Sequence, residues 1–290
     1  MKQLTVISGK GGTGKTTMTG AFAALAENQV VADGDVDAAD LHLILTPHIK
    51  KKESFYGGRA PVMDKDKCDE CGICMEVCRF DAIIDFVIDP ISCEGCGLCM
   101  HACPNEAINM EKKFSGHWFI SDTRFGPMVY AKLGIAEENS GKLVSLVRQQ
   151  AKLIAEKENR DLIIIDGPPG IGCPVIAAIS GVDLVLAVTE PTLSGIHDLE
   201  RVLGVADHFG VPAMVCVNKF DINPENTQKI KKYCQDNNIE VVGEIPYDPV
   251  VTRAMVEGQT VTEYDSGVVT EIVKNMWTRV EAGLGNVVKR

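Results

Sequence analysis

The sequence predicts an α/β fold, with a mostly parallel sheet covered by helices on both faces and interrupted by a small inserted α+β domain. Short apolar strands alternate with amphipathic helices along most of the chain, as in parallel sheets that are buried on both sides. A glycine-rich loop separates the first strand from the first helix. Eight of the 11 cysteines fall in one short segment, which marks the insertion.

The individual elements follow this alternation in order. Strands are expected at Leu4–Ser8, Val30–Asp33, Leu162–Asp166, Leu184–Thr189, Ala213–Val217 and Val241–Ile245. Helices are expected at Thr16–Glu27, Lys142–Glu158, Ile196–Phe209 and Glu225–Asn237, with a last helix in Val268–Arg290 docked on the sheet. Because the strand segments are apolar throughout, both faces of the sheet should be covered by helices.

The cysteine-rich insertion is bounded by two stretches that look like connections. Gly57–Pro61 is rich in glycine and proline and is interpreted as the linker into the insert, with Phe114–Asp122 as the return. The predicted division is an inserted domain at residues 60–112 within an outer domain of residues 1–59 and 113–290. A chain of 290 residues is long enough for two such domains.

Composition restricts the classes of partner. Hydrophobic residues make up 45% of the chain and charged residues 24%, as in ordinary globular proteins. The 40 acidic residues outnumber 29 Lys and Arg, and a net charge of −11 disfavours nucleic acid and anionic membranes as partners. No apolar run approaches the ~18 residues of a spanning helix, and Met1–Ser8 is too short for a signal peptide. We therefore expect a cytoplasmic protein.

A phosphate-binding loop is predicted at residues 9–16, which read GKGGTGKT and fit the pattern GxxxxGK[ST]. The loop lies directly after a strand and before a helix, as the mechanism requires. Glycines let backbone N–H groups face phosphate oxygens, Lys15 neutralises phosphate charge, and the Thr16 hydroxyl can ligate Mg²⁺. A glycine-rich structural turn is the alternative, which the flanking elements disfavour.

Lys10 makes the loop more specific. The segment KGGTGKT resembles the deviant Walker A motif of the MinD/ParA/nitrogenase-iron-protein superfamily of P-loop ATPases. In that family this extra lysine reaches the nucleotide of the partner subunit. The resemblance implies an ATP-dependent homodimer or paralogous heterodimer in which Lys10, Lys15 and Asp35 are catalytic. A solvated loop lysine is the alternative for Lys10.

Two acidic motifs appear in the order that the family has them. Asp33–Asp35 (DGD) resembles switch I, and Asp166–Gly170 (DGPPG) resembles Walker B with switch II. The resemblance implies that Asp35 positions the attacking water, that Asp35 and Asp166 join Thr16 around Mg²⁺, and that the Gly170 N–H contacts the γ-phosphate. Asp37 and Asp40 are interpreted as solvated residues at a helix start.

The nucleotide base has two candidate contacts. Asn218-Lys219 resembles the family's base-reading position, and Ile245–Asp248 resembles the loop that packs on the base. Asn218–Asp221 also fits the NKxD pattern by which GTPases read guanine, but Lys10 favours ATP. The predicted ATP contacts are Gly9, Lys10, Gly11, Gly12, Thr13, Gly14, Lys15, Thr16, Thr17, Asn218, Pro246 and Asp248.

The cysteine spacing CxxCxxCxxxC occurs twice, beginning at Cys68 and at Cys93, and is the spacing of bacterial two-cluster ferredoxins. In such repeats the fourth cysteine of each run ligates the other cluster. Two [4Fe-4S] clusters are therefore predicted, the first on Cys68, Cys71, Cys74 and Cys103, the second on Cys78, Cys93, Cys96 and Cys99. Structural zinc is the alternative, but zinc sites usually pair two CxxC knuckles across a longer gap.

Over nearly its full length the chain resembles MinD-superfamily P-loop ATPases that carry an inserted two-cluster ferredoxin domain. The first functional hypothesis is an ATPase that couples nucleotide state to its clusters. It would act in electron transfer, or in iron–sulfur or metallocofactor assembly, with an unidentified redox or cluster-accepting protein. The alternative is a MinD/ParA-like regulatory or positioning switch whose clusters sense redox state. A plain electron carrier is least favoured, because the nucleotide motifs are intact.

Overall fold

The computed structural model describes residues 1–134 and 140–286, and its described residues form two compact units. The first, called the sheet unit, comprises Met1–Lys52, Trp118–Lys132 and Ser140–Arg290. The second, called the cysteine unit, comprises Glu53–His117 with Leu133–Asn139, of which residues 133 and 134 are described. This unit is wider than the insert expected at 60–112. The basic end of the last predicted helix, Lys289-Arg290, lies outside the described residues.

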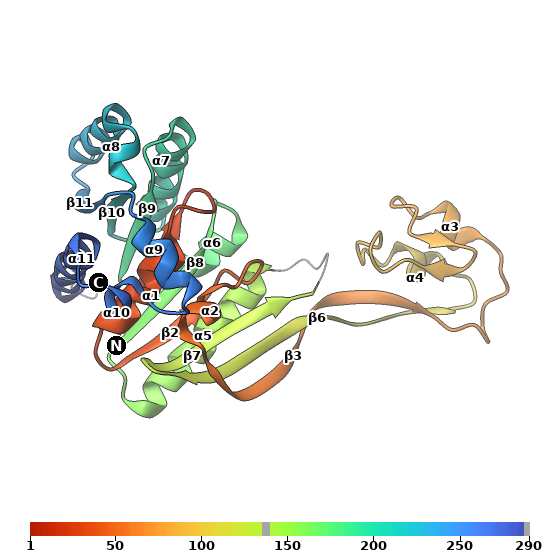
Figure 1. The fold of residues 1–290 in the computed structure, drawn as a ribbon. Coiled ribbons are helices and arrows are strands. Elements are labelled where there is room, and N and C mark those ends of the chain that lie inside the picture. The colour runs from red at the N-terminus through yellow and green to blue at the C-terminus, as the bar shows by residue number, and fades with distance from the viewer. Residues whose placement is uncertain (135–139, 287–290) are drawn as a thin grey trace. The chain divides into compact units, whose positions relative to one another are not determined.

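Among the described residues, nine strands form one sheet in the order β11-β10-β9-β1-β8-β2-β7-β6-β3. The pairs that join β11 through to β7 are all parallel, which confirms the predicted mostly parallel sheet (Figure 1). The strands are β1 (Lys2–Ser8), β2 (Gln29–Asp33), β3 (His48–Met63), β6 (Ile108–Thr123), β7 (Gly126–Leu133), β8 (Leu162–Pro169), β9 (Leu184–Thr189), β10 (Ala213–Asn218) and β11 (Glu240–Ile245).

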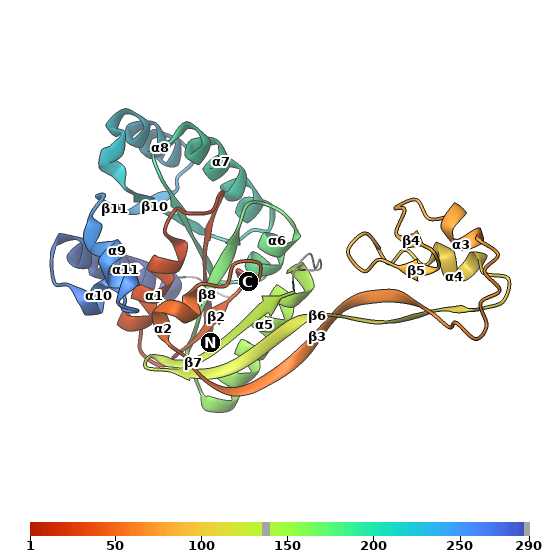
Figure 2. The ribbon, with the colours of Figure 1, turned by 45° about the vertical axis from the view of Figure 1, so that its right-hand side comes forward.

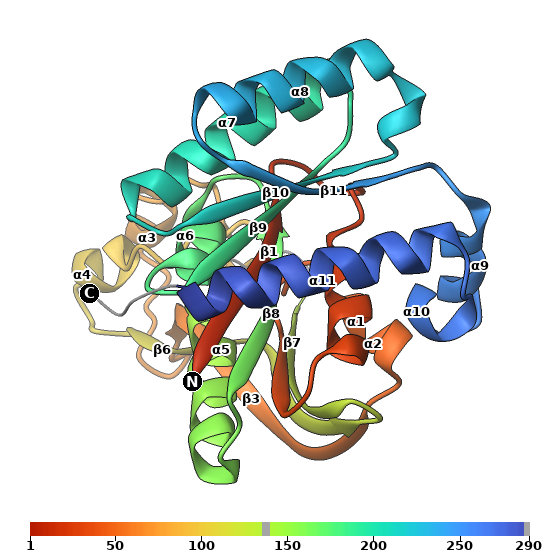
Figure 3. The same cartoon turned by 90° about the vertical axis from the view of Figure 1, so that its left-hand side faces the viewer.

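Helices cover both faces of this sheet. One face carries α1 (Lys15–Leu25) and α11 (Val268–Asn286), and α11 crosses in front of β1 and β8 in Figure 3. The other carries α5 (Ser140–Glu158), α6 (Cys173–Ile179), α7 (Leu193–His208) and α8 (Pro224–Asp236). Shorter helices follow strands or loops: α2 (Leu41–Leu45), η1 (Phe220–Ile222), α9 (Pro249–Val256) and α10 (Val261–Tyr264).

Successive side chains of a strand point to opposite faces of the sheet, which explains why there is a buried layer on each face. Leu162 and Ile164 of β8 join the core beneath α1 and α11, whereas Ile163 and Ile165 are fully buried outside that cluster. Trp277 of α11 packs with its ring centroid 5.0 Å from that of Phe22 in α1. The expected docking of the last helix on the sheet is thus confirmed. None of the described helices is long and apolar enough to cross a membrane.

The cysteine unit is built from two short helices and a hairpin, visible together in Figure 2. α3 (Ile73–Glu76) and α4 (Leu98–Ala102) accompany β4 (Ile83–Ile84) and β5 (Val87–Ile88), which pair antiparallel. Each helix follows a glycine with positive φ, Gly72 at 80° and Gly97 at 77°. Such a backbone favours glycine because it has no Cβ. Buried side chains of Cys74, Cys99 and Ile108 form the unit's core.

The two expected linkers are not loops. Gly57–Pro61 lies inside β3 and Phe114–Asp122 inside β6, because both segments are extended and take part in the sheet. Gly57 donates its N–H to Ser115 Oγ at 3.2 Å, and a Cβ at residue 57 would lie 3.0 Å from that oxygen. The glycine here therefore reflects close approach between strands rather than a turn. β3 and β6 each run from one unit into the other, so the two segments belong to connections made of extended strands rather than turns.

Candidate functional site

The glycine-rich loop leaves β1 and enters α1, as its sequence predicts. Gly12 and Gly14 have φ values of 78° and 98°, a conformation that L side chains rarely adopt. The Gly14 carbonyl accepts the Met18 N–H at 3.0 Å, and a Cβ on Gly14 would lie 2.6 Å from Asn218 Nδ2. The loop therefore has no room for a side chain at this position. Its geometry leaves the amino end of α1 facing the loop interior, where an anion is favoured.

Lys15 connects this loop to the acidic residues that follow β2. Its side chain is 5% exposed, and its Nζ lies 3.9 Å from Asp35 Oδ2. Asp35 follows β2, and β2 is paired with β8, the strand that carries Asp166. The carboxyl ends of parallel strands meet at one edge of a sheet, which is where these distant sequence motifs come together.

Asp166 lies on β8 and is completely buried. Its Oδ1 accepts a hydrogen bond from Thr19 Oγ1 at 2.9 Å, and Thr16 also hydrogen-bonds to its side chain. Oδ2 has no partner among the described residues. A buried carboxylate oxygen without a partner is costly, and it fits a hydrated cation such as Mg²⁺. Asp166, Thr16 and Asp35 are therefore suited to hold that ion.

Burial shifts the pKa values of these acids upward. Desolvation raises the pKa of Asp35 to about 6, while Lys15 lowers it. Desolvation likewise raises the pKa of Asp166, and it raises that of Asp33 well above its ordinary value, assisted by the charge of Asp166. Asp33 accepts the N–H groups of Asp35 at 3.1 Å and Leu41 at 3.3 Å. Three carboxyl groups at one site thus favour binding of a cation.

Lys10 is held within its own chain. Its Nζ lies 2.6 Å from Glu190 Oε1 and donates to the hydroxyl groups of Thr192 at 3.1 Å and Ser194 at 3.2 Å. Lys219 Nζ lies 3.3 Å from the other Glu190 oxygen. Burial raises the pKa of Glu190, but the two lysines outweigh this effect and hold it below its ordinary value. Glu190 was not predicted from the sequence, although it directly follows the apolar strand expected at Leu184–Thr189.

The expected base contacts lie at different places. Asn218 donates from Nδ2 to the Thr13 carbonyl at 2.8 Å, which puts it against the phosphate loop. Asp221, the aspartate of the NKxD pattern, accepts the Tyr247 N–H at 2.7 Å. Asp248 accepts the Val250 N–H at 2.8 Å and so caps α9. Contact of Asn218, Pro246 and Asp248 with a base remains a prediction.

Gly170 differs from the sequence expectation. Its N–H donates to the Ser8 carbonyl at 2.9 Å, so in this conformation it does not face the phosphate loop as a free donor. A contact with a γ-phosphate would first require this hydrogen bond to break. Gly170 has a φ of 93°, which glycine tolerates during such a change better than other residues.

The eight clustered cysteines surround two separate hollows in the cysteine unit. The first hollow is small and is lined by Cys68, Cys71, Cys74 and Cys103. The second is also small and is lined by Cys78, Cys93, Cys96 and Cys99. These are the two crossed sets that the spacing predicts. Cys78 Sγ and Cys103 Sγ also accept backbone N–H groups, from Ala82 at 3.4 Å and Ala107 at 3.3 Å.

Within residues 1–134 and 140–286, no group of three or more His, Cys, Asp or Glu side chains is placed to hold a single metal ion.

Comparison with known proteins identifies the class of protein that this fold and loop define. The family described as "CobQ/CobB/MinD/ParA nucleotide binding domain" matches residues 4–261, so the chain belongs to that family. An uncharacterized protein of Methanocaldococcus jannaschii, MJ0578, is 39% identical over 228 residues, 77% of this chain and 80% of its own length.

More distant similarity connects the chain with septum site-determining proteins. MinD of Bacillus subtilis is 28% identical over 148 residues, which cover 49% of this chain and 54% of MinD. The structure of MinD from Pyrococcus horikoshii, solved with Mg-ADP, matches with a TM-score of 0.61 and 19% identity, covering 100% of this chain and 99% of that one. This last similarity shows the shared fold.

Proposed function

We propose that this protein is an ATP-hydrolysing nucleotide switch of the MinD/ParA type, and that its cysteine unit holds two [4Fe-4S] clusters that sense redox state. The observation that carries the nucleotide proposal is the position of Lys15. This buried lysine of the glycine loop lies beside Asp35, at the edge of the sheet that also carries Asp166. Family membership supports the same reading. The protein is expected to act in the cytoplasm, without nucleic acid or membrane as its partner.

Each residue of the nucleotide site has a proposed role. The N–H groups of residues 9–14 and Lys15 would bind the phosphates, and Thr16, Asp35 and Asp166 would hold Mg²⁺ directly or through water. Mg²⁺, when bound, neutralises charge on the phosphate oxygens. Asp35 would orient the attacking water by accepting a hydrogen bond. The ionised form is needed for this role, so Lys15 also assists by lowering the pKa of Asp35.

Lys10 would be the residue that acts across a dimer. In this structure its Nζ is paired with Glu190 of the same chain. We infer that ATP binding brings two chains together and that Lys10 then exchanges Glu190 for phosphate of the facing nucleotide. The partner chain would be a second copy or a paralogue.

The two hollows fit [4Fe-4S] clusters because each is lined by four cysteines in the crossed arrangement. Cys74 and Cys99 are buried and would face the clusters from the core, while the backbone N–H groups of Ala82 and Ala107 would stabilise sulfur charge. Each cluster, when bound, supplies a reversible one-electron centre. Loss of an electron changes the cluster charge, which is the signal that a redox sensor would transmit.

The switch is now favoured over the first hypothesis from the sequence, electron transfer or cofactor assembly. The family and the MinD relatives support a nucleotide-dependent switch, and they provide no support for electron transfer. A specific observation keeps electron transfer as the second candidate: Cys71 and Cys96, one at each hollow, are exposed. Centres close to the surface can exchange electrons with a partner protein.

One experiment tests the proposal. Anaerobically purified protein is assayed for iron and sulfide, and its ATP hydrolysis and its mass by light scattering are then measured with MgATP, in oxidised and reduced states. We expect an ATP-dependent dimer whose amount depends on redox state. Lys15→Ala should lose nucleotide binding, whereas Lys10→Ala should bind ATP without forming the dimer.

The outcomes separate the parts of the proposal. A protein that stays monomeric with MgATP is not a switch of this type. A dimer and an ATPase rate that are identical in both redox states exclude redox sensing and leave electron transfer as the better candidate. Purified protein without iron and sulfide excludes the clusters.

A further inference from the structure

The two halves of the cysteine repeat are not equivalent around their hollows. Aligning Cys68 with Cys93 places Asp69 opposite Glu94 and Phe80 opposite Asn105. At the first hollow, Asn105 hydrogen-bonds to the carboxylate of Asp69. At the second hollow the corresponding residues are Phe80 and Glu94, and a phenyl ring cannot form that bond. Both hollows have a phenyl ring in their lining, Phe86 at the first and Phe80 at the second, but the Asp69–Asn105 pair has no counterpart at the second hollow.

Two of the apolar side chains that line the second hollow are more exposed than those that line the first. Phe80 is 40% exposed and Leu98 is 49% exposed, and both line the second hollow. Ile73, the counterpart of Leu98 in the repeat, lines the first hollow together with Phe86. Both are half-buried and therefore less exposed than the two residues at the second hollow. Contiguous exposed apolar surface marks sites of contact with other proteins, and Phe80 and Leu98 both contribute such surface to one hollow.

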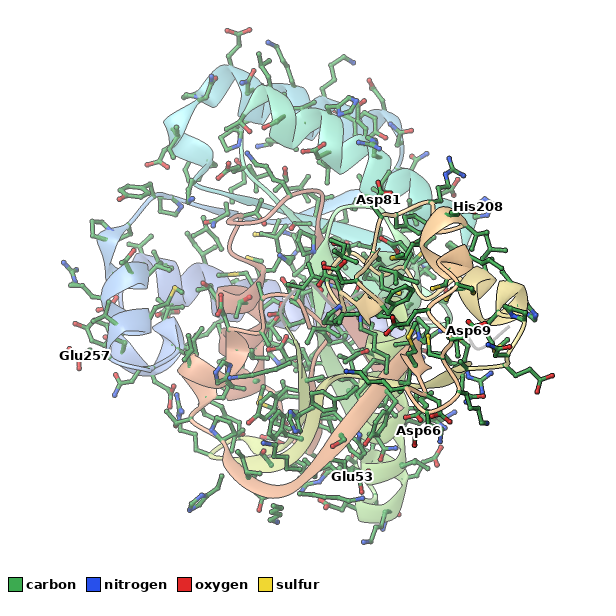
Figure 4. All side chains as sticks on the ribbon, turned by 90° about the vertical axis from the view of Figure 1, so that its right-hand side faces the viewer. Glu53, Asp66, Asp69, Asp81, His208 and Glu257 are labelled. Atoms are coloured by element: carbon green, nitrogen blue, oxygen red, sulfur yellow. The ribbon has the colours of Figure 1, made fainter. Side chains whose placement is uncertain are left out.

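The surrounding surface is strongly acidic. Residues 64–106 contain ten Asp and Glu against three Lys and Arg, a formal net charge of −7, compared with −11 for the whole chain. Glu94 lines the second hollow and Asp81 follows Phe80, while Arg79 precedes it. Figure 4 labels Asp66, Asp69 and Asp81, which lie on different sides of the cysteine unit. Such a surface attracts basic partners and repels acidic ones.

We propose that the face formed by Phe80 and Leu98 at the second hollow is the docking site for a basic electron-carrier protein. The inference rests on the proposed clusters and names the one that exchanges electrons with the partner, the cluster on Cys78, Cys93, Cys96 and Cys99. Apolar contact at Phe80 and Leu98 excludes water, and the acidic surface selects and orients the partner. One electron passes between the cluster and the carrier's redox centre, so one is oxidised and the other reduced, and no proton or bond is exchanged.

The experiment uses the full-length holoprotein and a defined probe, cytochrome c, a small basic electron carrier. Iron and sulfide are measured first, and binding of ferric cytochrome c is then titrated by calorimetry at ~20 mM and ~300 mM salt. The rate at which dithionite-reduced holoprotein reduces cytochrome c is followed separately. We expect at least about tenfold weaker binding at the higher salt concentration.

Variants from the two halves of the repeat provide matched controls. Leu98→Ser should weaken binding by about fivefold, whereas Ile73→Ser, its counterpart at the first hollow, should change it less than about twofold. Asp81→Lys, an exposed change that avoids the core, should weaken binding by about fivefold, and Asp66→Lys, with the same change in charge, by less than about twofold. The rate of cytochrome c reduction should fall more in Leu98→Ser and Asp81→Lys than in Ile73→Ser and Asp66→Lys.

Equal effects of Asp81→Lys and Asp66→Lys would show that attraction is diffuse and would overturn the docking face. Equal effects of Leu98→Ser and Ile73→Ser on iron-loaded proteins would overturn it as well. These results would leave the clusters themselves in place. A wild-type protein that contains no iron and sulfide would instead refute the clusters, and with them the electron-exchange role of this face.

Discussion

The carboxylate of Glu190 binds Lys10 of the same chain, with Oε1 and Nζ 2.6 Å apart. Lys219 binds the second oxygen of the same carboxylate at 3.3 Å. Glu190 and Lys10 side chains are 16% and 29% exposed, so the pair is partly shielded from solvent. Lys10, which the family resemblance predicts to act between subunits, is therefore engaged inside one subunit.

Glu190→Gln should make Lys10 easier to release and should promote the ATP-dependent dimer. The amide keeps the shape of the side chain but loses its charge, which removes about 1 kcal/mol of attraction. The half-saturating protein concentration for dimerisation should fall by about fivefold, measured by light scattering with MgATP. Glu200→Gln, on the exposed side of α7, is the control. A dimer that becomes weaker in Glu190→Gln would mean that this carboxylate supports the dimer rather than opposing it.

Asp35→Asn should stabilise the protein free of Mg²⁺ and nucleotide at neutral pH. The folded pKa is raised from 3.8 to about 6, so between these values the folded state binds more protons than the unfolded state. Stability from this group is therefore present at low pH and is lost as pH rises through about 6. Removing the charge should raise the free energy of unfolding by roughly 1–3 kcal/mol at pH ~7.5 and much less at pH ~4.5.

Urea unfolding of wild type and Asp35→Asn at the two pH values measures this difference. Asp236→Asn, at an exposed position on α8, should show no comparable pH-dependent gain. A gain of the same size at both pH values would argue against the ionisation of Asp35 as its cause.

Trp277→Ala should destabilise the sheet unit strongly. The indole is 5% exposed and packs on Phe22 of α1, within the core that also contains the β1, β8 and β9 side chains. Truncating a buried tryptophan costs about 3–5 kcal/mol, because it removes apolar contact and leaves a cavity. Chemical unfolding would measure the loss, with Asn275→Ala on the exposed face of α11 as the control. An unchanged midpoint would show that α11 contributes little to the fold.

Crossed ligation of the clusters predicts an uneven result for double substitutions. Cys78→Ser with Cys96→Ser affects only the second hollow, so about half of the iron should remain. Cys71→Ser with Cys78→Ser affects one hollow each and should remove both clusters. Iron analysis and EPR of the reduced proteins distinguish the two. If the fourth cysteine instead served its own run, the order of the two double variants would be reversed.

Most of the sheet unit was predictable because its signals are local. Buried apolar strands such as Leu184–Thr189 and the loop before Lys15 carry their structure in short runs of sequence, and both are found where the sequence placed them. The strand at Gly57–Pro61 was not predicted, because glycine and proline are typical of turns. Gly57 actually serves a close approach to Ser115, a contact with a residue far along the chain.

The sequence by itself determined the class of fold, the phosphate loop and the pairing of cysteines into two sets, since each depends on spacing along the chain. Only the tertiary structure decided that Glu190 holds Lys10, because that contact joins the ends of two neighbouring strands, β1 and β9. It also decided that Asp166 Oδ2 lacks a partner among the described residues and that Phe80 and Leu98 remain exposed. Burial, exposure and contact are properties of the packed molecule, and no local pattern encodes them.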